Sequence, residues 1–152
     1  MKNLFAPSLP TRLTTTSTLF PHMTHNLLLV DPDRFVAHVL RHTLAPEFKI
    51  STLPNGLEAM NWLEAGNHPD VIVTELDLPY VDGYEFIQLV RSSSLLRHLP
   101  IIVLSAEDDS TTRVACLERG ADGYLSKPFN PYEVRAKAKS ILRRMHLVPA
   151  YS

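Results

Sequence analysis

The amino-acid sequence predicts an α/β fold, a doubly wound sandwich with helices on both sides of a five-stranded parallel sheet. From residue 26 onward, short apolar runs alternate five times with segments of helical periodicity. The run DVIVTEL at 70–76 is nearly all apolar, which is typical of a strand that helices cover on both faces. The length also fits, because 152 residues are enough for one domain with its own core.

The predicted elements alternate along the chain. We expect strands at 26–30, 48–52, 70–76, 100–106 and 123–126, and helices at 33–44, 55–66, 84–96, 108–120 and 130–145. Apolar residues at helical spacing predict the inward sides of three helices: Phe35, Val36, Val39, Leu40 and Leu44 in the first, Leu57, Met60, Trp62 and Leu63 in the second, and Val134, Ala138, Ile141 and Met145 in the last.

Capping residues mark several helix ends. Asp109 is a predicted N-cap, and so is Asn130, which Pro131 follows at the first helical position. Gly66 and Gly120 are predicted to end the helices that precede them. These local signals support the same alternation of strands and helices.

Charge and composition exclude several classes of protein. The 15 lysines and arginines nearly balance the 16 acids, and a net charge of −1 argues against a strongly basic nucleic-acid binder. Cys116 is the only cysteine, so an internal disulfide is impossible and a reducing compartment is expected. No apolar run approaches the length of a membrane span. We therefore expect a soluble, cytoplasmic protein.

The first 25 residues differ in composition from the rest of the chain. They contain no acid, are rich in threonine and serine, and show no apolar periodicity. We expect residues 1–25 to be a disordered extension, while a targeting segment and a natural start at Met23 stay open as alternatives. The predicted domain covers 26–148, and a short tail covers 149–152.

Polar residues follow four of the predicted strands at their carboxyl ends, where parallel α/β sheets bind ligands. They are Asp31 and Asp33 after the first strand, Thr74, Glu75 and Asp77 at the third, Ser105 and Ala106 at the fourth, and Ser126, Lys127 and Pro128 at the fifth. If these strands are neighbours, carboxylates, a hydroxyl and an ammonium converge in one cleft. Such a cluster suits a phosphoryl group or a divalent cation.

Four sequence blocks resemble, in order and spacing, the receiver domain of the two-component response-regulator family. They are LLLVDPD, PDVIVTELDLPYVDGYEF, PIIVLSA and GADGYLSKPF, all within residues 26–146. The resemblance implies a flavodoxin-like, CheY-like fold with strand order 2-1-3-4-5. It also implies a signalling module and not an enzyme, and the sequence has no P-loop, nucleophile-elbow or zincin motif.

The resemblance assigns roles to most of the strand-end residues. Asp31 matches the first acid of the family's acidic pair, Ser105 the switch hydroxyl, Tyr124 the switch aromatic and Lys127 the family's lysine. Asp77 matches the position whose backbone carbonyl the family offers to the metal. We therefore expect these five residues to surround the site.

Two positions depart from the family's pattern. Glu75 stands where the family has its phosphoacceptor aspartate, and Pro32 stands where it has a second, metal-binding acid. Asp33, one residue further on, is expected to cap the first helix, with an orientation into the site as the alternative. Glutamate reaches about 1.5 Å further than aspartate, and a misplacement of about 1 Å can cost roughly a hundredfold in rate.

The two departures predict a receiver that is phosphorylated very slowly or not at all. We expect Glu75 to pair with Lys127 as a built-in anion that imitates the phosphoryl group in part. No cofactor is expected, and Mg²⁺ is expected to bind weakly if at all, through Asp31, Glu75 and Asp77. Two alternatives stay open: a site in which Glu75 is only a structural remnant, and a phosphorylatable, Mg²⁺-dependent switch.

The expected partners are other signalling proteins, namely a histidine kinase, a phosphotransfer protein or an effector. The last predicted helix resembles that of receivers that precede DNA-binding domains, and it suggests a homodimer through 108–120, 123–126 and 130–145. Only HLVPAYS follows it, which predicts either a stand-alone receiver without an output domain or a receiver fragment of a DNA-binding regulator. Direct nucleic-acid binding is not expected, because the basic residues of the last predicted helix are not accompanied by a ladder of aromatic residues.

Overall fold

A computed structural model describes residues 24–147 of the chain. Ten elements alternate within this range: β1 (His25–Val30), α2 (Arg34–Leu44), β2 (Phe48–Leu53), α3 (Gly56–Glu64), β3 (Val71–Thr74), α4 (Gly83–Ser92), β4 (Ile101–Ser105), α5 (Ser110–Arg119), β5 (Gly123–Ser126) and α6 (Pro131–Leu147). The expected extension at 1–25, apart from residues 24 and 25, and the expected tail at 149–152 lie outside the described residues. No helix in the described part of the chain is long and apolar enough to cross a membrane.

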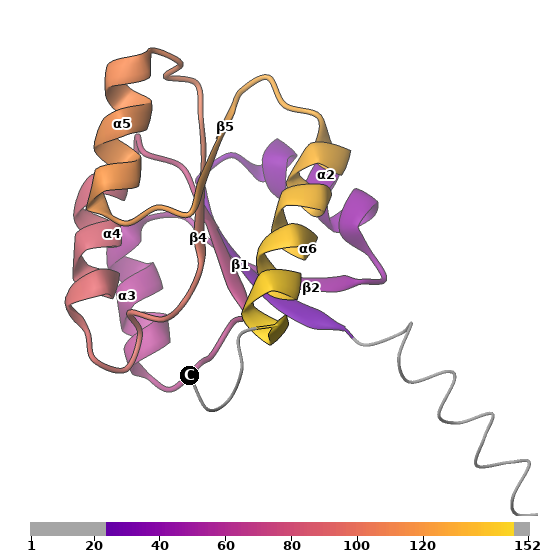
Figure 1. The fold of residues 1–152 in the computed structure, drawn as a ribbon, viewed down its shortest axis with the longest axis horizontal. Coiled ribbons are helices and arrows are strands. Elements are labelled where there is room, and N and C mark those ends of the chain that lie inside the picture. Colours follow the sequence, from indigo (N-terminus) through magenta and orange to yellow (C-terminus); the bar gives the residue numbers. More distant parts are fainter. Residues whose placement is uncertain (1–23, 148–152) are drawn as a thin grey trace, which may run out of the picture.

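The five strands form one parallel sheet in the order β2-β1-β3-β4-β5. Figure 1 shows the sheet between two layers of helices, with α2 and α6 on one face and α3, α4 and α5 on the other. The predicted fold class and strand order are therefore confirmed. Right-handed crossovers explain this arrangement, because the connection from β1 to β2 runs toward one edge of the sheet and the later connections run toward the other edge. As a result, α2 lies on one face, and α3, α4 and α5 lie on the opposite face.

The strands divide their side chains between the two cores. In β1, Leu27 and Leu29 join the core under α2 and α6, whereas Leu28 and Val30 join the core under α3, α4 and α5. All four side chains are buried, because a central strand of such a sheet is covered on both faces. The apolar run in the sequence is thus explained by burial on two sides.

Three predicted inward residues are wrong. Phe35 is 69% exposed, because it lies one residue before the stripe that Val36 begins in α2. Leu57 is 46% exposed at the margin of the buried face of α3. Met145 is 38% exposed, because it lies in the last turns of α6 beyond the buried Ile141. In each case the residue has the spacing of the buried face of its helix, but it lies at the margin of that face, where no neighbouring element covers it.

Most of the helix ends that were predicted from capping residues agree with the structure. Asp109 accepts a hydrogen bond from the backbone N–H of Thr112 and begins α5, and Gly120 ends it with a φ of 115°. The Asn130 side chain accepts from the N–H of Tyr132 at the start of α6. The predicted helix at 84–96 is shorter in the structure, since α4 ends at Ser92.

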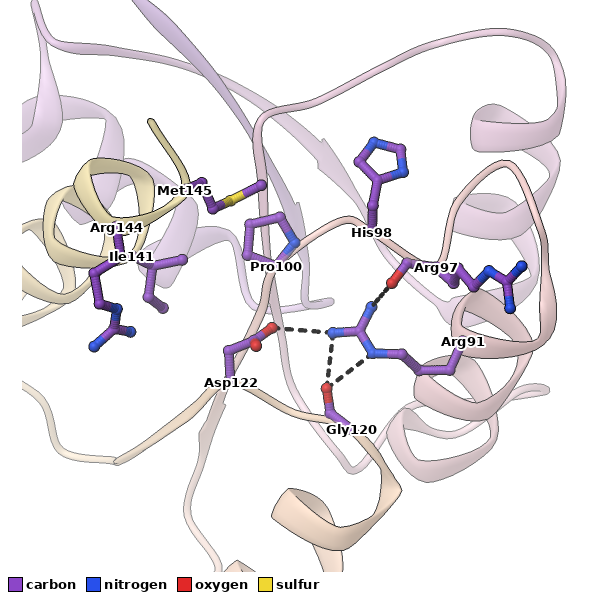
Figure 2. A pocket seen from close by; sticks show the side chains of 9 residues that line it. All are labelled: Arg91, Arg97, His98, Pro100, Gly120, Asp122, Ile141, Arg144 and Met145. Atoms are coloured by element: carbon purple, nitrogen blue, oxygen red, sulfur yellow. Dashed lines mark hydrogen bonds and ion pairs between the residues drawn. The ribbon is translucent and has the colours of Figure 1, made fainter. Parts of the chain in front are cut away.

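The amino ends of β4 and β5 lie at the edge of the sheet opposite the strand-end cluster. There Arg91 donates hydrogen bonds to the backbone carbonyls of Arg97, Leu99 and Gly120 and pairs with Asp122 at 3.0 Å. Figure 2 shows this guanidinium bonded to Gly120, Asp122 and Arg97. Arg91 is one of the residues that line a hollow of about 340 Å³ between the α4–β4 loop, the start of β5 and the end of α6. Arg91 thus joins two loops that are distant in the sequence.

Candidate functional site

The strand ends bring Asp31, Glu75 and Lys127 together at the carboxyl edge of the sheet. Asp31 directly follows β1, Glu75 directly follows β3, and Lys127 directly follows β5. Because β1 and β3 are neighbours, the two acids lie side by side, and the long lysine side chain reaches them from the far side of β4. The predicted convergence of carboxylates and an ammonium is therefore present.

One ammonium holds both carboxylates. Nζ of Lys127 lies 2.8 Å from Oδ2 of Asp31 and 2.8 Å from Oε2 of Glu75. The acid side chains are only 2% and 9% exposed, while that of Lys127 is 19% exposed. The expected pair between Glu75 and Lys127 is found, and Asp31 shares the same cation. Buried charges of this kind are stable only when they are paired and hydrogen-bonded.

Backbone donors bind the two remaining carboxylate oxygens. Oδ1 of Asp31 accepts a hydrogen bond of 2.8 Å from the N–H of Asp33. Oε1 of Glu75 accepts from the N–H of Leu76 at 2.6 Å and from that of Asp77 at 3.3 Å. Three of the four carboxylate oxygens therefore accept hydrogen bonds, and the fourth, Oε2 of Glu75, is ion-paired with Lys127.

These contacts set the ionisation of the pair. Burial alone raises the pKa of the Glu75 carboxyl, but Lys127, the hydroxyl of Ser105 and the backbone N–H of Leu76 outweigh it and hold this pKa below its usual value. Burial alone lowers the pKa of Lys127, but Asp31 and Glu75 outweigh it and raise this pKa. Both shifts favour the charged forms, so Glu75 and Lys127 are both ionised at neutral pH.

Pro32 and Asp33 lie outside this cluster. Pro32 is exposed and brings no carboxylate to the site. Oδ1 of Asp33 accepts a hydrogen bond of 2.8 Å from the N–H of Phe35, which makes Asp33 the N-cap of α2. The expected capping role is observed, and the alternative orientation into the site is not. The side chain of Asp77 is exposed, so only its backbone contributes to the site.

The two switch positions border the cluster on β4 and β5. Ser105, which ends β4, is buried, and its Oγ accepts from the N–H of Glu107 at 3.3 Å. Tyr124 on β5 packs against the core under α3, α4 and α5, and its buried hydroxyl has no hydrogen-bond partner among the described residues. Burial raises the pKa of Tyr124 to about 12, so the hydroxyl stays protonated.

Gly83 supports the position of Glu75, a role that the sequence analysis missed. The N–H of Gly83 donates to the carbonyl of Leu76 at 2.9 Å. A Cβ at this position would lie 2.5 Å from the carbonyl oxygen of Glu75 and 2.6 Å from Cα of Leu76. Asp82 and Gly83 thus begin α4 and also bring its first turn close to the loop that carries Glu75. The sequence indicates this contact only through the Asp-Gly dipeptide.

A second polar contact near the site was also missed. Asp108 accepts hydrogen bonds from the hydroxyl of Ser126, at 2.6 Å, and from the guanidinium of Arg113. It thereby connects the β4–α5 loop to the end of β5 beside Lys127. Nothing in the sequence pattern around Asp108 indicates this partner, since the two residues are 18 positions apart.

The donor set for a metal ion is incomplete. The described residues contain no group of three or more histidine, cysteine, aspartate or glutamate side chains that is arranged to hold one. Asp31 and Glu75 are the only buried carboxylates in the described range, and both contact the ammonium of Lys127. The residues present therefore do not fit Mg²⁺, which prefers several oxygen ligands in octahedral geometry.

Comparison with known proteins gives consistent relatives. The family model of the response regulator receiver domain matches residues 27–139. The chain is 36% identical over 126 residues to the alkaline phosphatase synthesis transcriptional regulatory protein PhoP of Bacillus subtilis, which covers 82% of the chain and 51% of the relative. It is 40% identical over 119 residues to the response regulator MprA of Mycobacterium sp. strain KMS, with coverages of 78% and 50%. The chain thus spans about half the length of these relatives.

Solved structures give the same result. The receiver domain of Francisella response regulator 1452 has a TM-score of 0.73 and 28% identity, and the match covers 80% of this chain and 99% of that one. The receiver domain of a sensor histidine kinase from Pseudomonas aeruginosa PAO1, solved with magnesium in its active-site cleft, has a TM-score of 0.71, 27% identity and coverages of 78% and 98%. The chain belongs to the response regulator receiver domain family.

Proposed function

We propose that this receiver domain is a pseudo-receiver, a protein-docking or regulatory module of a two-component or phosphorelay pathway that is not itself phosphorylated. The observation that carries the proposal is the ion pair of 2.8 Å between Glu75 and Lys127. This pair places a carboxylate and its cation where the receiver family forms an acyl phosphate on aspartate. Glu75 acts as a built-in anion in place of that phosphate.

The contacts of Glu75 oppose phosphoryl transfer. Its Oε2 contacts Lys127 and its Oε1 accepts two backbone hydrogen bonds, so neither oxygen is free to attack. The extra methylene of glutamate moves the carboxylate by about 1.5 Å relative to aspartate, and in-line transfer tolerates far less. Pro32 supplies no acid to a metal that would neutralise the developing charge. The displaced carboxylate of Glu75 impairs attack on the phosphoryl group, and the lack of an acid at Pro32 impairs metal binding. Both features slow phosphorylation.

The built-in anion imitates phosphate only in part. Glutamate brings one negative charge, whereas a phosphoryl group brings nearly two. We therefore propose that the domain is held in a single conformational state at Ser105 and Tyr124, and that this state docks a histidine kinase, a phosphotransfer protein or an effector. Its contribution to signalling is binding and not catalysis.

A second candidate function is the receiver part of a DNA-binding transcriptional regulator. It is favoured by the relative that is named a transcriptional regulatory protein and that is about twice as long as the matched region. A phosphorylatable receiver in such a protein would use Asp31, Ser105 and Lys127 as the family does. Salt-dependent retention of the full-length protein on DNA would support this candidate.

Nuclear magnetic resonance spectra of three proteins test the proposal. Glu75→Gln keeps the size of the side chain and removes its charge, so we expect shifts that spread from Lys127 to Ser105 and Tyr124. Beryllofluoride with Mg²⁺, an analogue of the phosphoryl group, is expected to leave the unaltered protein unchanged and to shift the Glu75→Asp, Pro32→Asp double variant. Shifts in the unaltered protein on addition of the analogue would contradict the proposal.

A further inference from the structure

We propose that the hollow beside Arg91 binds a small organic molecule that carries two anionic groups on an apolar body. The hollow is lined by residues that precede β4 and β5 and by the last turns of α6, so it lies at the amino edge of the sheet. The cluster of Glu75 and Lys127 lies at the carboxyl edge. The proposal therefore concerns a second site and goes beyond the proposed function of the receiver.

Part of the lining of the hollow is apolar. Pro100 is buried, Ile141 is 4% exposed, and Met145 lies one turn further along α6 with 38% of its surface exposed. Small-molecule sites in proteins typically combine such a lining with a few polar groups in a volume of roughly 300–1,000 Å³. With a volume of about 340 Å³, the hollow falls within this range. Its size and lining suit a small organic molecule.

Arg91 shapes the hollow but has no free donor to offer a ligand. Its guanidinium makes five hydrogen bonds, which is as many as it has N–H groups. Four of these bonds go to backbone carbonyls, and the fifth goes to the carboxylate of Asp122 at 3.0 Å. The pair of Arg91 and Asp122 is therefore a neutral, structural element that holds the surrounding loops in place.

Two further arginines bring uncompensated positive charge to the hollow. Arg97 and Arg144 are both exposed, and neither pairs with an acid within residues 24–147. Figure 2 shows them on opposite sides of the hollow, Arg97 on the α4–β4 loop and Arg144 on α6. Three arginines and one aspartate in the lining give a net charge of +2. The hollow therefore favours a ligand with negative charge.

The positions of these groups define the chemistry of the ligand. Guanidinium groups bind carboxylate and phosphate oxygens through paired N–H groups. Because Arg97 and Arg144 lie on opposite sides, they favour two separated anionic groups in place of one. The apolar side chains of Ile141 and Met145 favour an apolar body between those groups. Such a ligand joins the α4–β4 loop to the last turns of α6.

Nuclear magnetic resonance titration of the intact chain with naphthalene-2,6-dicarboxylate, a rigid dianion with an apolar body, tests the proposal. We expect shifts centred on the lining residues, such as Ile141 and Met145. Naphthalene-2-carboxylate, which has one charge less, is expected to bind about threefold more weakly, because an exposed ion pair contributes little more than this. The uncharged naphthalene-2-methanol is expected to bind more weakly still.

Three variants identify the cations that bind the probe. Arg97→Gln and Arg144→Gln are each expected to weaken binding of the dicarboxylate about threefold, and the double variant about tenfold. Arg143→Gln is the matched control, because Arg143 is also exposed on α6 but does not line the hollow. We expect this control to bind as the unaltered protein does. All three positions are exposed, and Arg91 uses only the backbone carbonyl of Arg97, so the variants are expected to fold.

Three results would overturn the proposal. One is the absence of shifts at the lining residues with millimolar dicarboxylate. Another is equal weakening by Arg143→Gln and Arg144→Gln, which would show that the basic surface of α6 attracts the anion without the hollow. The third is equal binding of the dicarboxylate and the uncharged naphthalene-2-methanol, which would show that the arginines do not recognise the ligand.

Discussion

Replacing Lys127 by methionine is expected to destabilise the domain strongly at neutral pH. The change keeps most of the apolar length of the side chain and removes the only cation among residues 24–147 that contacts Asp31 and Glu75. The two carboxylates are 2% and 9% exposed, so water replaces the ammonium poorly. Removal of one partner of a buried ion pair typically costs about 3–5 kcal/mol. We expect a loss near the lower end, about 3 kcal/mol, because Lys127 itself is partly exposed.

The size of this loss is expected to depend on pH. In the unaltered protein the folded-state pKa of Glu75 lies below 4.5, so its contribution is present above about pH 4.5 and is lost as the pH falls through the lower, folded-state value. The folded-state pKa of Lys127 lies above 10.5, so its contribution is present below that pH and is lost as the pH rises through the folded-state value. Between these limits the unaltered protein gains constant stability from the pair.

The variant behaves differently between pH 7 and pH 5. Without the ammonium, burial and the neighbouring charge of Asp31 raise the pKa of Glu75, and folding then takes up a proton. The free energy of unfolding of Lys127→Met is therefore expected to increase as the pH falls over this range, so that the difference from the unaltered protein narrows.

Urea unfolding followed by circular dichroism at pH 5, 6, 7 and 8 measures both effects. Lys49→Met, an exposed lysine on β2, is the control, and its expected change is below about 0.5 kcal/mol at every pH. A loss for Lys127→Met that is below about 1 kcal/mol and independent of pH would refute the view that Lys127 compensates two buried charges.

Three further changes test the surroundings of the site. Gly83→Ala places a Cβ 2.5 Å from the carbonyl oxygen of Glu75, so we expect a loss of about 2 kcal/mol in urea unfolding, and a loss below about 0.5 kcal/mol would show that α4 moves away freely. Arg91→Met removes donors to the carbonyl of Gly120 and to two carbonyls of the α4–β4 loop, and the expected loss is about 2 kcal/mol, with faster amide hydrogen exchange in that loop as the distinguishing sign. Asp33→Ala removes the N-cap of α2 at a cost of about 1 kcal/mol, which Asp33→Ser should largely restore; equal stabilities of the two variants would contradict the capping role.

The sequence predicted the parts of this protein that depend on local patterns. The alternation of apolar runs and helical segments predicted the fold class, and the resemblance to the receiver family predicted the order of the strands. The capping residues Asp109 and Gly120 predicted the two ends of α5. The meeting of Glu75 and Lys127 was predictable, because both follow strands whose carboxyl ends share one edge. That Asp31 shares the same ammonium was not expected from the sequence, and the structure contains both pairs.

The features that the sequence did not predict depend on contacts between distant segments. Phe35 has the spacing of a core residue, but whether a position on the margin of a helix is covered depends on the neighbouring elements. The bond between Asp108 and Ser126 and the contacts of Arg91 with Gly120 join residues that are 18 and 29 positions apart, and no periodicity encodes them. The close approach of Gly83 to the Glu75 loop is likewise a tertiary contact, of which the sequence shows only the glycine.

Intact mass after incubation with a small phosphodonor and Mg²⁺ tests the central claim most directly. The unaltered protein, Glu75→Asp, and the Glu75→Asp, Pro32→Asp double variant are compared side by side. The account predicts no added phosphoryl group on the unaltered protein and one on the double variant, in which both departures from the family pattern are reversed. A phosphoryl group on the unaltered protein would contradict the account and would make this domain a phosphorylatable switch.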